Sequence, residues 1–378
     1  MSRPPTLWLC ERTIVTSPTA EAADFRPDGS PAAPKGPGAA ETVGLGPALA
    51  PDKLLAHGAL LRRFVDGDRL RPVHLRLALA PDGTGSTPST GLATHDAVRL
   101  LRGFADAGGR AVSFRGGGEP TAHPGYAAVC DAGHEAGLRL GLVTDGVRLG
   151  RPDVAECVAS THTWARVAFA DDATLLDDVG RLRQSAIDPD FRIGFHYVIG
   201  ARNRTGILRA ARAARGAGAH YIRFETAPGA HDGPGALDAT AAPDATAALT
   251  EAALLVTRDF EVHLAPHDRD HPANGRFHRC HYSRFTATVG ADGHLYPCPQ
   301  VRTDSHYRTG DVVADGWAEA LDGDARAAWE ATDPLGTERC GSCFYRPQNE
   351  LLEQLRAGHG PASEYATEVP STLHADFV

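Results

Sequence analysis

Strand-like and helix-like segments alternate between residues 72 and 226, and this alternation limits the fold more than any other feature. Alternation of this kind predicts parallel strands joined by right-handed helical crossovers, and so an α/β class. Strands are expected at 73–79, 111–114, 138–143, 164–169, 192–199 and 220–224. Helices are expected at 52–65, 94–104, 126–136, 203–215, 244–259 and 349–356. Six strand–helix units favour a partial (β/α)6 TIM-like barrel over a closed barrel of eight.

Composition argues against two kinds of partner. No run of 18 consecutive apolar residues occurs, so no membrane span is expected. The formal net charge is −9, which lacks the basic surplus typical of nucleic-acid binders. The apolar run at residues 7–10 is too short for the core of a secretory signal, so a cytoplasmic location is expected.

Changes in residue composition along the chain predict four parts. Residues 1–51 are rich in Ala, Pro and Gly and are expected to be flexible. Residues 52–262 carry the barrel. Residues 263–360 form a loop-rich C-terminal unit with a hairpin at 285–296, signalled by an Asp-Gly turn. Residues 361–378 are expected to be a polar tail.

A glycine run follows the second predicted strand, where Arg115 precedes Gly116, Gly117, Gly118 and Glu119. Without a Cβ, such a backbone can approach a ligand closely, and the Glu119 carboxylate could accept from an ammonium group. Ligand sites of parallel α/β folds lie at the carboxyl ends of strands, where this run falls. A tight strand-to-helix turn is the alternative reading.

Four of the seven cysteines lie in the last third of the chain with the spacing of a metal site. Twelve residues separate Cys280 from Gly293, four more precede Cys298, and Cys340 and Cys343 form a Cys-x2-Cys pair. In a cytosolic chain this pattern indicates metal rather than disulfides. Four thiolates suit a [4Fe–4S] cluster or a tetrahedral Zn²⁺, and four unrelated buried thiols remain the alternative.

The glycine run resembles a motif of the radical S-adenosylmethionine (SAM) superfamily. Residues 112–120, Val-Ser-Phe-Arg-Gly-Gly-Gly-Glu-Pro, are similar to its Gly-Gly-Glu motif, which follows the second strand of a partial barrel and holds the amino group of SAM. Residues 142–146 and 198–203 resemble segments at the third and fifth strands, so the resemblance spans residues 52–360. It implies cofactor binding by Gly116, Gly117, Gly118, Glu119 and Asp145.

The late cysteines resemble the Cys-x(9–15)-Gly-x4-Cys signature of SPASM and twitch domains, which bind auxiliary iron–sulfur clusters. Four cysteines match the twitch form with one cluster. The resemblance therefore implies one [4Fe–4S] cluster, with Zn²⁺ as the alternative, held by Cys280, Cys298, Cys340 and Cys343.

The loop after the first strand departs from the family pattern. Family members carry Cys-x3-Cys-x2-Cys there, and its cluster chelates and cleaves SAM. This chain has Gly83, Thr87 and Thr90 at those positions. Hydroxyl groups are hard and ionise too reluctantly to replace thiolates at iron, so no cluster is expected in this degenerate loop. Whether SAM itself still binds is left open.

The sequence therefore predicts a radical-SAM-like protein that does not perform radical chemistry alone. An accessory role beside an active radical SAM enzyme, or on its peptide or small-molecule substrate in natural-product biosynthesis, is the first hypothesis. An enzyme with repurposed polar chemistry and a zinc-stabilised binding module are the alternatives. No catalytic residue is assigned. His123 and His196 could act as acid–base groups but favour packed or solvated roles. Arg223 could meet a carboxylate, with a structural ion pair as the alternative.

Overall fold

A computed structural model describes residues 50–81, 91–200, 202–226, 243–264, 277–337, 340, 343, 345–358 and 374–378. Almost all of the predicted N-terminal segment, the loop at 82–90 and most of the predicted tail lie outside these ranges. Among the described residues, no helix is both long and apolar enough to cross a membrane.

Ten strands form one sheet in the order β10-β9-β8-β1-β2-β3-β4-β5-β6-β7. They are β1 His74–Leu77, β2 Ala111–Phe114, β3 Arg139–Thr144, β4 His162–Ala168, β5 Arg192–Ile199, β6 Tyr221–Thr226, β7 Glu261–Leu264, β8 Thr286–Val289, β9 His294–Tyr296 and β10 Gly310–Asp311. Every pair from β8 through β1 to β7 is parallel, whereas β9 and β10 pair antiparallel. The mixed α/β barrel expected from the alternation is confirmed, with β7 as a further parallel strand.

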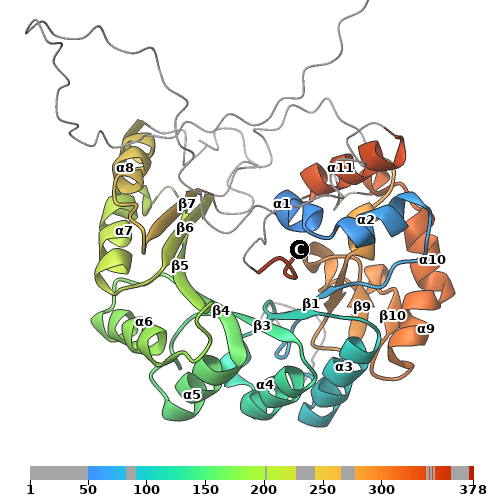
Figure 1. Cartoon of the computed structure of the whole chain (residues 1–378), viewed down its shortest axis with the longest axis horizontal. Coiled ribbons are helices and arrows are strands. Elements are labelled where there is room, and N and C mark those ends of the chain that lie inside the picture. The colour runs from blue at the N-terminus through green and yellow to red at the C-terminus, as the bar shows by residue number, and fades with distance from the viewer. Residues whose placement is uncertain are drawn as a thin grey trace, which may run out of the picture.

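The described helices are α1 Ala50–Leu55, α2 Gly58–Val65, α3 Thr94–Asp106, α4 Tyr126–Glu135, α5 Pro152–Thr161, α6 Ala173–Ser185, α7 Ile207–Gly216, α8 Pro243–Ala253, α9 Gly316–Asp322, α10 Asp324–Ala331 and α11 Arg346–Arg356. Helices α3 to α10 surround the outside of the curved sheet, whereas α1, α2 and α11 pack together at the open side of the ring (Figure 1). The helix expected at 52–65 is divided, because the backbone of His57 leaves the helical region and its N–H bonds to the Leu54 oxygen three residues back.

The main core lies between the sheet and its outer helices. In β1, Leu75 and Leu77 are fully buried in this core, and alternation places His74 and Arg76 on the opposite, inner face. The same pattern recurs in β6, where Ile222 and Phe224 belong to the outer core. The outer face of the sheet is therefore apolar, and its inner face carries polar and charged side chains.

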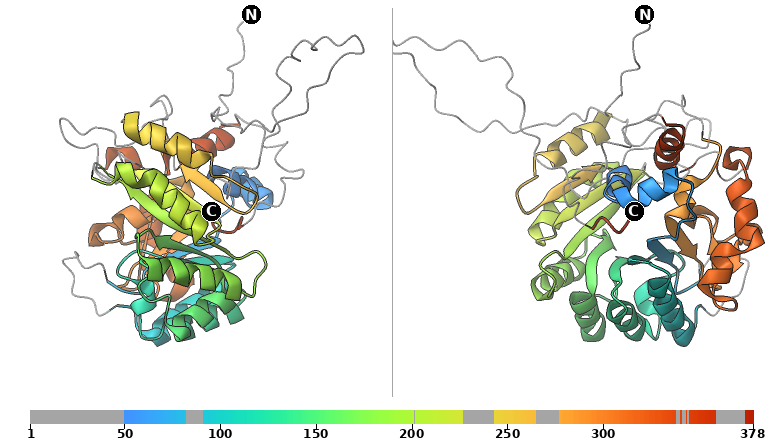
Figure 2. Two further views of the ribbon diagram at one scale, coloured as in Figure 1. Left: turned by 90° about the vertical axis from the view of Figure 1, so that its left-hand side faces the viewer. Right: turned by 45° about the vertical axis from the view of Figure 1, so that its right-hand side comes forward.

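The end of the chain closes the inside of the barrel near the amino ends of the strands. Val378 is buried in a second core with residues of α1, α2 and α11, and Figures 1 and 2 show the last residues inside the ring beside α1. Its backbone oxygen accepts from Nη2 of Arg76 at 2.9 Å and lies 2.6 Å from Nδ1 of His74. Asp376 pairs with Arg110, which precedes β2, and with Arg139, the first residue of β3.

Candidate functional site

The glycine run crosses the end of β1 at close range. Gly116 and Gly117 have φ of +79° and +72°, and a Cβ at Gly117 would collide with the backbone oxygen of Ala80. The N–H of Gly118 donates to that same oxygen at 3.2 Å. A Cβ at Gly116 would lie 2.8 Å from Nε of Arg302, which belongs to the C-terminal unit. Close packing within the chain therefore accounts for both glycines, as in the tight-turn reading.

Glu119 ties the ends of β2 and β3 together. Its Oε1 accepts from the N–H of Thr121 at 3.0 Å, from the Thr121 hydroxyl at 2.6 Å and from the Thr144 hydroxyl at 2.7 Å. Its Oε2 accepts from the N–H of Asp145 at 2.8 Å. Because Oε1 is saturated, only Oε2 retains capacity for a further donor such as an ammonium group.

Asp145 lies beside Glu119 and is exposed. Its Oδ1 accepts from the N–H of Val147 at 2.9 Å, so the carboxylate closes its own turn. Partial burial first, and then the negative charge of Glu119, raise the pKa of Asp145. Of the five residues predicted to bind a cofactor, Glu119 and Asp145 bond to each other, whereas the glycines pack against Ala80 and Arg302.

The loop after β1 follows the carboxyl end of that strand, and this end of the barrel is called the barrel mouth below. No cysteine occurs between Cys10 and Cys130 in the sequence, which covers the whole loop after β1. Gly83, Thr87 and Thr90 lie outside the described residues. Iron in a [4Fe–4S] cluster takes soft thiolate ligands, so the donor set at this end does not fit that cluster.

The four late cysteines come together from three segments between residues 277 and 345. Cys280 precedes the 3₁₀ turn His281–Arg284, Cys298 precedes the turn Pro299–Val301, and Cys340 and Cys343 precede α11. Burial first, and then the charges of the other three thiols, raise the pKa of Cys343. Similar causes raise the pKa of Cys298 to about 12. The four sulfurs therefore lie within electrostatic range of each other.

Their spacing separates the two metal alternatives. A tetrahedral Zn²⁺ with Zn–S bonds of about 2.3 Å needs its sulfurs about 3.8 Å apart. No three of these four thiols lie within 4.8 Å of one another in the part of the chain that the structure describes. A cubane cluster binds each thiolate through a different iron and holds the sulfurs farther apart, so the donors fit a [4Fe–4S] cluster better than zinc.

Polar and charged side chains near the thiols interact with Cys343 and Cys280. Asn349 places its Nδ2 3.9 Å from Sγ of Cys343 and accepts from the N–H of Tyr282 at 2.9 Å. Arg326 is 2 % exposed, donates to the backbone oxygen of Ser283, and favours the thiolate of Cys280 by its charge. Groups of this kind orient metal ligands and offset their charge.

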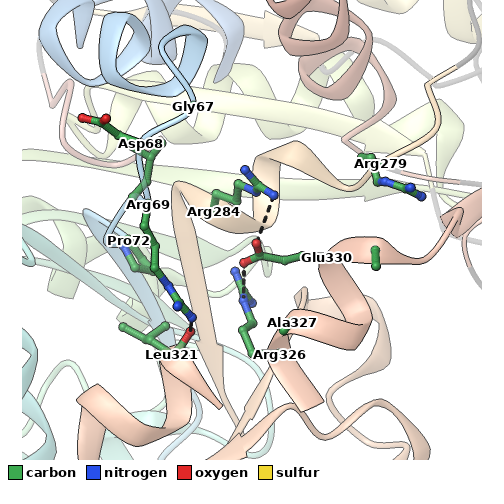
Figure 3. A pocket seen from close by; sticks show the side chains of 12 residues that line it. Gly67, Asp68, Arg69, Pro72, Arg279, Arg284, Leu321, Arg326, Ala327 and Glu330 are labelled. Carbon is green, nitrogen blue, oxygen red and sulfur yellow. Dashed lines mark hydrogen bonds and ion pairs between the residues drawn. The ribbon is translucent and has the colours of Figure 1, made fainter. Parts of the chain in front are cut away.

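A cavity of about 460 Å³ lies between the segment 67–72 and helix α10 (Figure 3). Arg279 and Arg284 line it with Arg326, and Glu330 bridges the last two at 3.1 Å and 3.0 Å. Sequence reasoning did not find this basic cavity, because its residues come from segments that are distant along the chain.

Two cysteines outside the metal pattern also meet. Cys130 of α4, Cys157 of α5 and His162 of β4 place their ligand atoms within 4.8 Å of one another, and all three are buried. Nε2 of His162 lies 2.9 Å from the Tyr126 hydroxyl, and Nδ1 lies 2.9 Å from the Thr161 hydroxyl. Because both ring nitrogens have protein partners, this group is packed core.

The side chains expected in packed or paired roles are found in them. His123 is buried, with Nε2 2.7 Å from the backbone oxygen of Leu92 and Nδ1 accepting from the N–H of Gly125. On the inner face of the sheet, Oε1 of Glu225 lies 2.5 Å from Nε2 of His196, and Oε2 lies 3.3 Å from Nε of Arg223. Arg223 therefore has an ion-pair partner within its own strand, as in the structural alternative.

The comparisons with known proteins identify the fold. No family model and no curated protein matches this chain. The structure of Streptococcus suis SuiB bound to S-adenosylmethionine matches with a TM-score of 0.55 and 12% identity, covering 80% of this chain and 77% of that chain. SuiB bound to the precursor peptide SuiA gives 0.54 and 12%, covering 84% and 78%. The chain therefore has the α/β fold of a protein that binds SAM and a peptide precursor, and at this identity the likeness shows the fold alone.

Proposed function

We propose that this chain is an iron–sulfur protein on a radical-SAM-like barrel that does not cleave SAM. It serves as an accessory subunit beside an active radical SAM enzyme, or holds that enzyme's peptide or small-molecule substrate. The observation that carries the proposal is the distribution of thiols. The barrel mouth has none in its first loop, whereas four gather in the C-terminal unit at 263–360.

The barrel mouth can bind a ligand without cleaving it. Without a cluster beside the glycine run, an electron has no entry point to a bound sulfonium. Oε2 of Glu119 retains acceptor capacity for an ammonium group. Weak binding of an amine is therefore compatible with this end of the barrel, and reductive cleavage is not.

The C-terminal unit supplies the ligands of the single cluster. Cys280, Cys298, Cys340 and Cys343 would hold it, and such a cluster supplies one-electron transfer or structural support. Arg302 lies four residues beyond Cys298 and packs against Gly116, so the segment that carries a ligand also contacts the barrel mouth. The accessory unit and the barrel are thereby mechanically linked.

A second candidate, an enzyme with repurposed polar chemistry, is favoured by one observation. Glu225 contacts both His196 and Arg223 inside the barrel, where a ligand in the interior would meet them. The third hypothesis, a zinc-stabilised module, is disfavoured by the wide spacing of the four thiols.

Anaerobic reconstitution tests the proposal. We expect about four irons and four sulfides per chain, with no 5′-deoxyadenosine formed from SAM after reduction with dithionite. About eight irons, or deoxyadenosine released by the isolated chain, would contradict it. A colourless protein with one zinc per chain would favour the binding module instead.

A further inference from the structure

Five cationic side chains of the described residues converge on the inside of the barrel. Neighbouring positions of a strand point to opposite faces, and the outer face of each strand packs under the helices. The positions between these core residues therefore face inward. The inward cations are Arg76 of β1, Arg115 after β2, Arg166 of β4 and Arg223 of β6, joined by Lys53 of α1.

These cations are close enough to repel one another. Burial first, and then the charges of Arg166, Arg223 and Arg76, lower the pKa of Lys53 to about 7. Partial loss of hydration around the guanidinium, and then the charges of Arg76 and Arg166, also lower the pKa of Arg115, although much of the side chain stays exposed. Folding thus brings like charges together at an energetic cost that a bound anion could offset.

The carboxylates nearby offset little of this charge. Glu225 contacts Arg223 and His196, and although its burial acts in the opposite sense, the His196 bond and the charges of Arg223 and Arg166 lower its pKa to about 2. Glu261 of β7 pairs with His263 at 3.0 Å. Among the described ion pairs, Arg223 is the one inward arginine with a carboxylate side-chain partner, and Arg76 donates to an oxygen of the last residue, Val378.

Two of the arginines have N–H groups that still lack acceptors. Arg76 is 5 % exposed and donates from Nη2 to the Tyr282 hydroxyl and the Val378 oxygen, yet its Nε and Nη1 find no partner among the described residues. Nε of Arg166 is also buried without a partner there. A buried donor without an acceptor costs about 1–3 kcal/mol, so these groups are poised for oxygen ligands.

Solvent reaches this interior. Arg115 is exposed, although the charges of Arg76, Arg166 and Glu225 on the surrounding strands all act on it. A side chain that protein surrounds and water still contacts lies in open space, so a small solute can reach the same place.

We propose that the inner face of this barrel binds a small ligand that carries two or more phosphate or carboxylate groups. Arg76 and Arg166 would donate to one anionic group, and Lys53 with Arg223 would face another. The inference names a substrate class for the barrel and rests on the proposed function only in taking the barrel interior as the ligand side. Planar guanidinium groups suit both kinds of oxyanion.

Lys53 gives the experiment a clean readout, because Lys35 is the other lysine of this chain. The holoprotein is acetylated with limiting acetic anhydride at pH 7.5, with and without inorganic pyrophosphate or citrate, and both lysines are quantified by peptide mass spectrometry. The titratable neighbours His74 and His374 have pKa values lowered chiefly by burial, that of His374 to about 4, so they are neutral at this pH.

We expect an anion to slow acetylation of Lys53 at least about threefold and to leave Lys35 unchanged. A bound anion favours the ammonium form, and a rise of one unit in a pKa near 7 reduces the unprotonated fraction at pH 7.5 from about three quarters to one quarter. Protection by pyrophosphate alone identifies a phosphate ligand, and protection by citrate alone a polycarboxylate. No protection beyond that of sodium chloride at equal ionic strength would overturn the proposal.

Matched variants separate binding from screening. Arg166→Gln should abolish the protection, whereas Arg212→Gln, at an exposed position of α7, should retain it. Circular dichroism confirms folding, and Arg223→Gln replaces Arg166→Gln if the latter does not fold. Equal protection in all variants would also overturn the proposal. Iron and sulfide counts on the same samples test the proposed function separately, because they do not depend on the acetylation of Lys53.

Discussion

The barrel mouth and the thiol site differ in whether the chain satisfies its own polar groups. At the mouth, Glu119 receives four hydrogen bonds from residues of two strand ends. At the thiol site, burial raises the pKa of Cys298 and Cys343, and no three thiols are in mutual contact. A group that the fold leaves unsatisfied needs a ligand, whereas a group that the fold satisfies can serve the fold alone.

The largest effect expected from this comparison is loss of the metal. Cys298→Ser should reduce iron from about four to near zero per chain, because a hydroxyl does not replace a thiolate at iron. Iron and sulfide assays and the visible absorption of the cluster measure the change. Cys157→Ser is the matched control, since Cys157 is a buried cysteine outside the set, and it should keep its iron. Loss of iron in Cys157→Ser but not in Cys298→Ser would place the cluster elsewhere.

Inside the barrel, Lys53→Met should stabilise the protein by about 4 kcal/mol at pH 7. Lys53 has a pKa of about 7 when folded and 10.5 otherwise, so between these values the unfolded chain binds the extra proton. Stability of the wild type therefore rises with pH across this window, and the advantage of the variant should shrink toward pH 10. Thermal denaturation at pH 7, 8.5 and 10 checks this, and an advantage that does not change with pH would contradict it.

A backbone test at the mouth should give the next largest effect. Gly117→Ala should lower the free energy of unfolding by about 2–4 kcal/mol, from positive φ and from the collision with Ala80. Urea denaturation measures it. Gly108→Ala has φ of +95° with nothing near the added Cβ, so about 1–2 kcal/mol is expected there. Equal losses would show that the close approach at Gly117 contributes nothing.

The smallest effect is expected from Glu119→Gln. The amide oxygen can still accept from the threonine hydroxyls, but its NH2 group would face the N–H of Asp145, at a cost of about 1–2 kcal/mol. Iron content should not change, because the thiol site is elsewhere. Calorimetry with SAM adds a second readout, since any heat of binding in the wild type should disappear in this variant. SAM binding that survives Glu119→Gln would exclude this carboxylate as its anchor.

Much of the fold follows from local pattern. The strands 111–114 and 192–199 were predicted with the bounds that the structure gives, because each carries its apolar alternation within a few residues. The β9 strand and its Asp-Gly turn are equally local. Helices α5 and α6 were not predicted, since their apolar residues are interrupted by charged ones and packing against the sheet decides them.

Some candidate site residues could be found from the sequence, whereas others are brought together only by the fold. The four thiols could be found from spacing, because metal ligands repeat at characteristic intervals along a chain. The inward cations could not, since Lys53 and Arg223 are separated by most of the barrel and carry no shared motif. The same holds for Cys130, Cys157 and His162, which stand apart in sequence and meet between two helices and a strand.

By itself, the sequence determined the order of the first six strands, the set of four late cysteines and the lack of thiols in the first loop. These properties depend on residues a few positions apart or on simple presence and absence. Tertiary structure alone decided that β8 pairs with β1, that Glu119 is satisfied by its neighbours and that five cations face one interior. The physical reason is that curvature of the sheet converts distant positions into neighbours, and electrostatic energy depends on distance in space rather than along the chain.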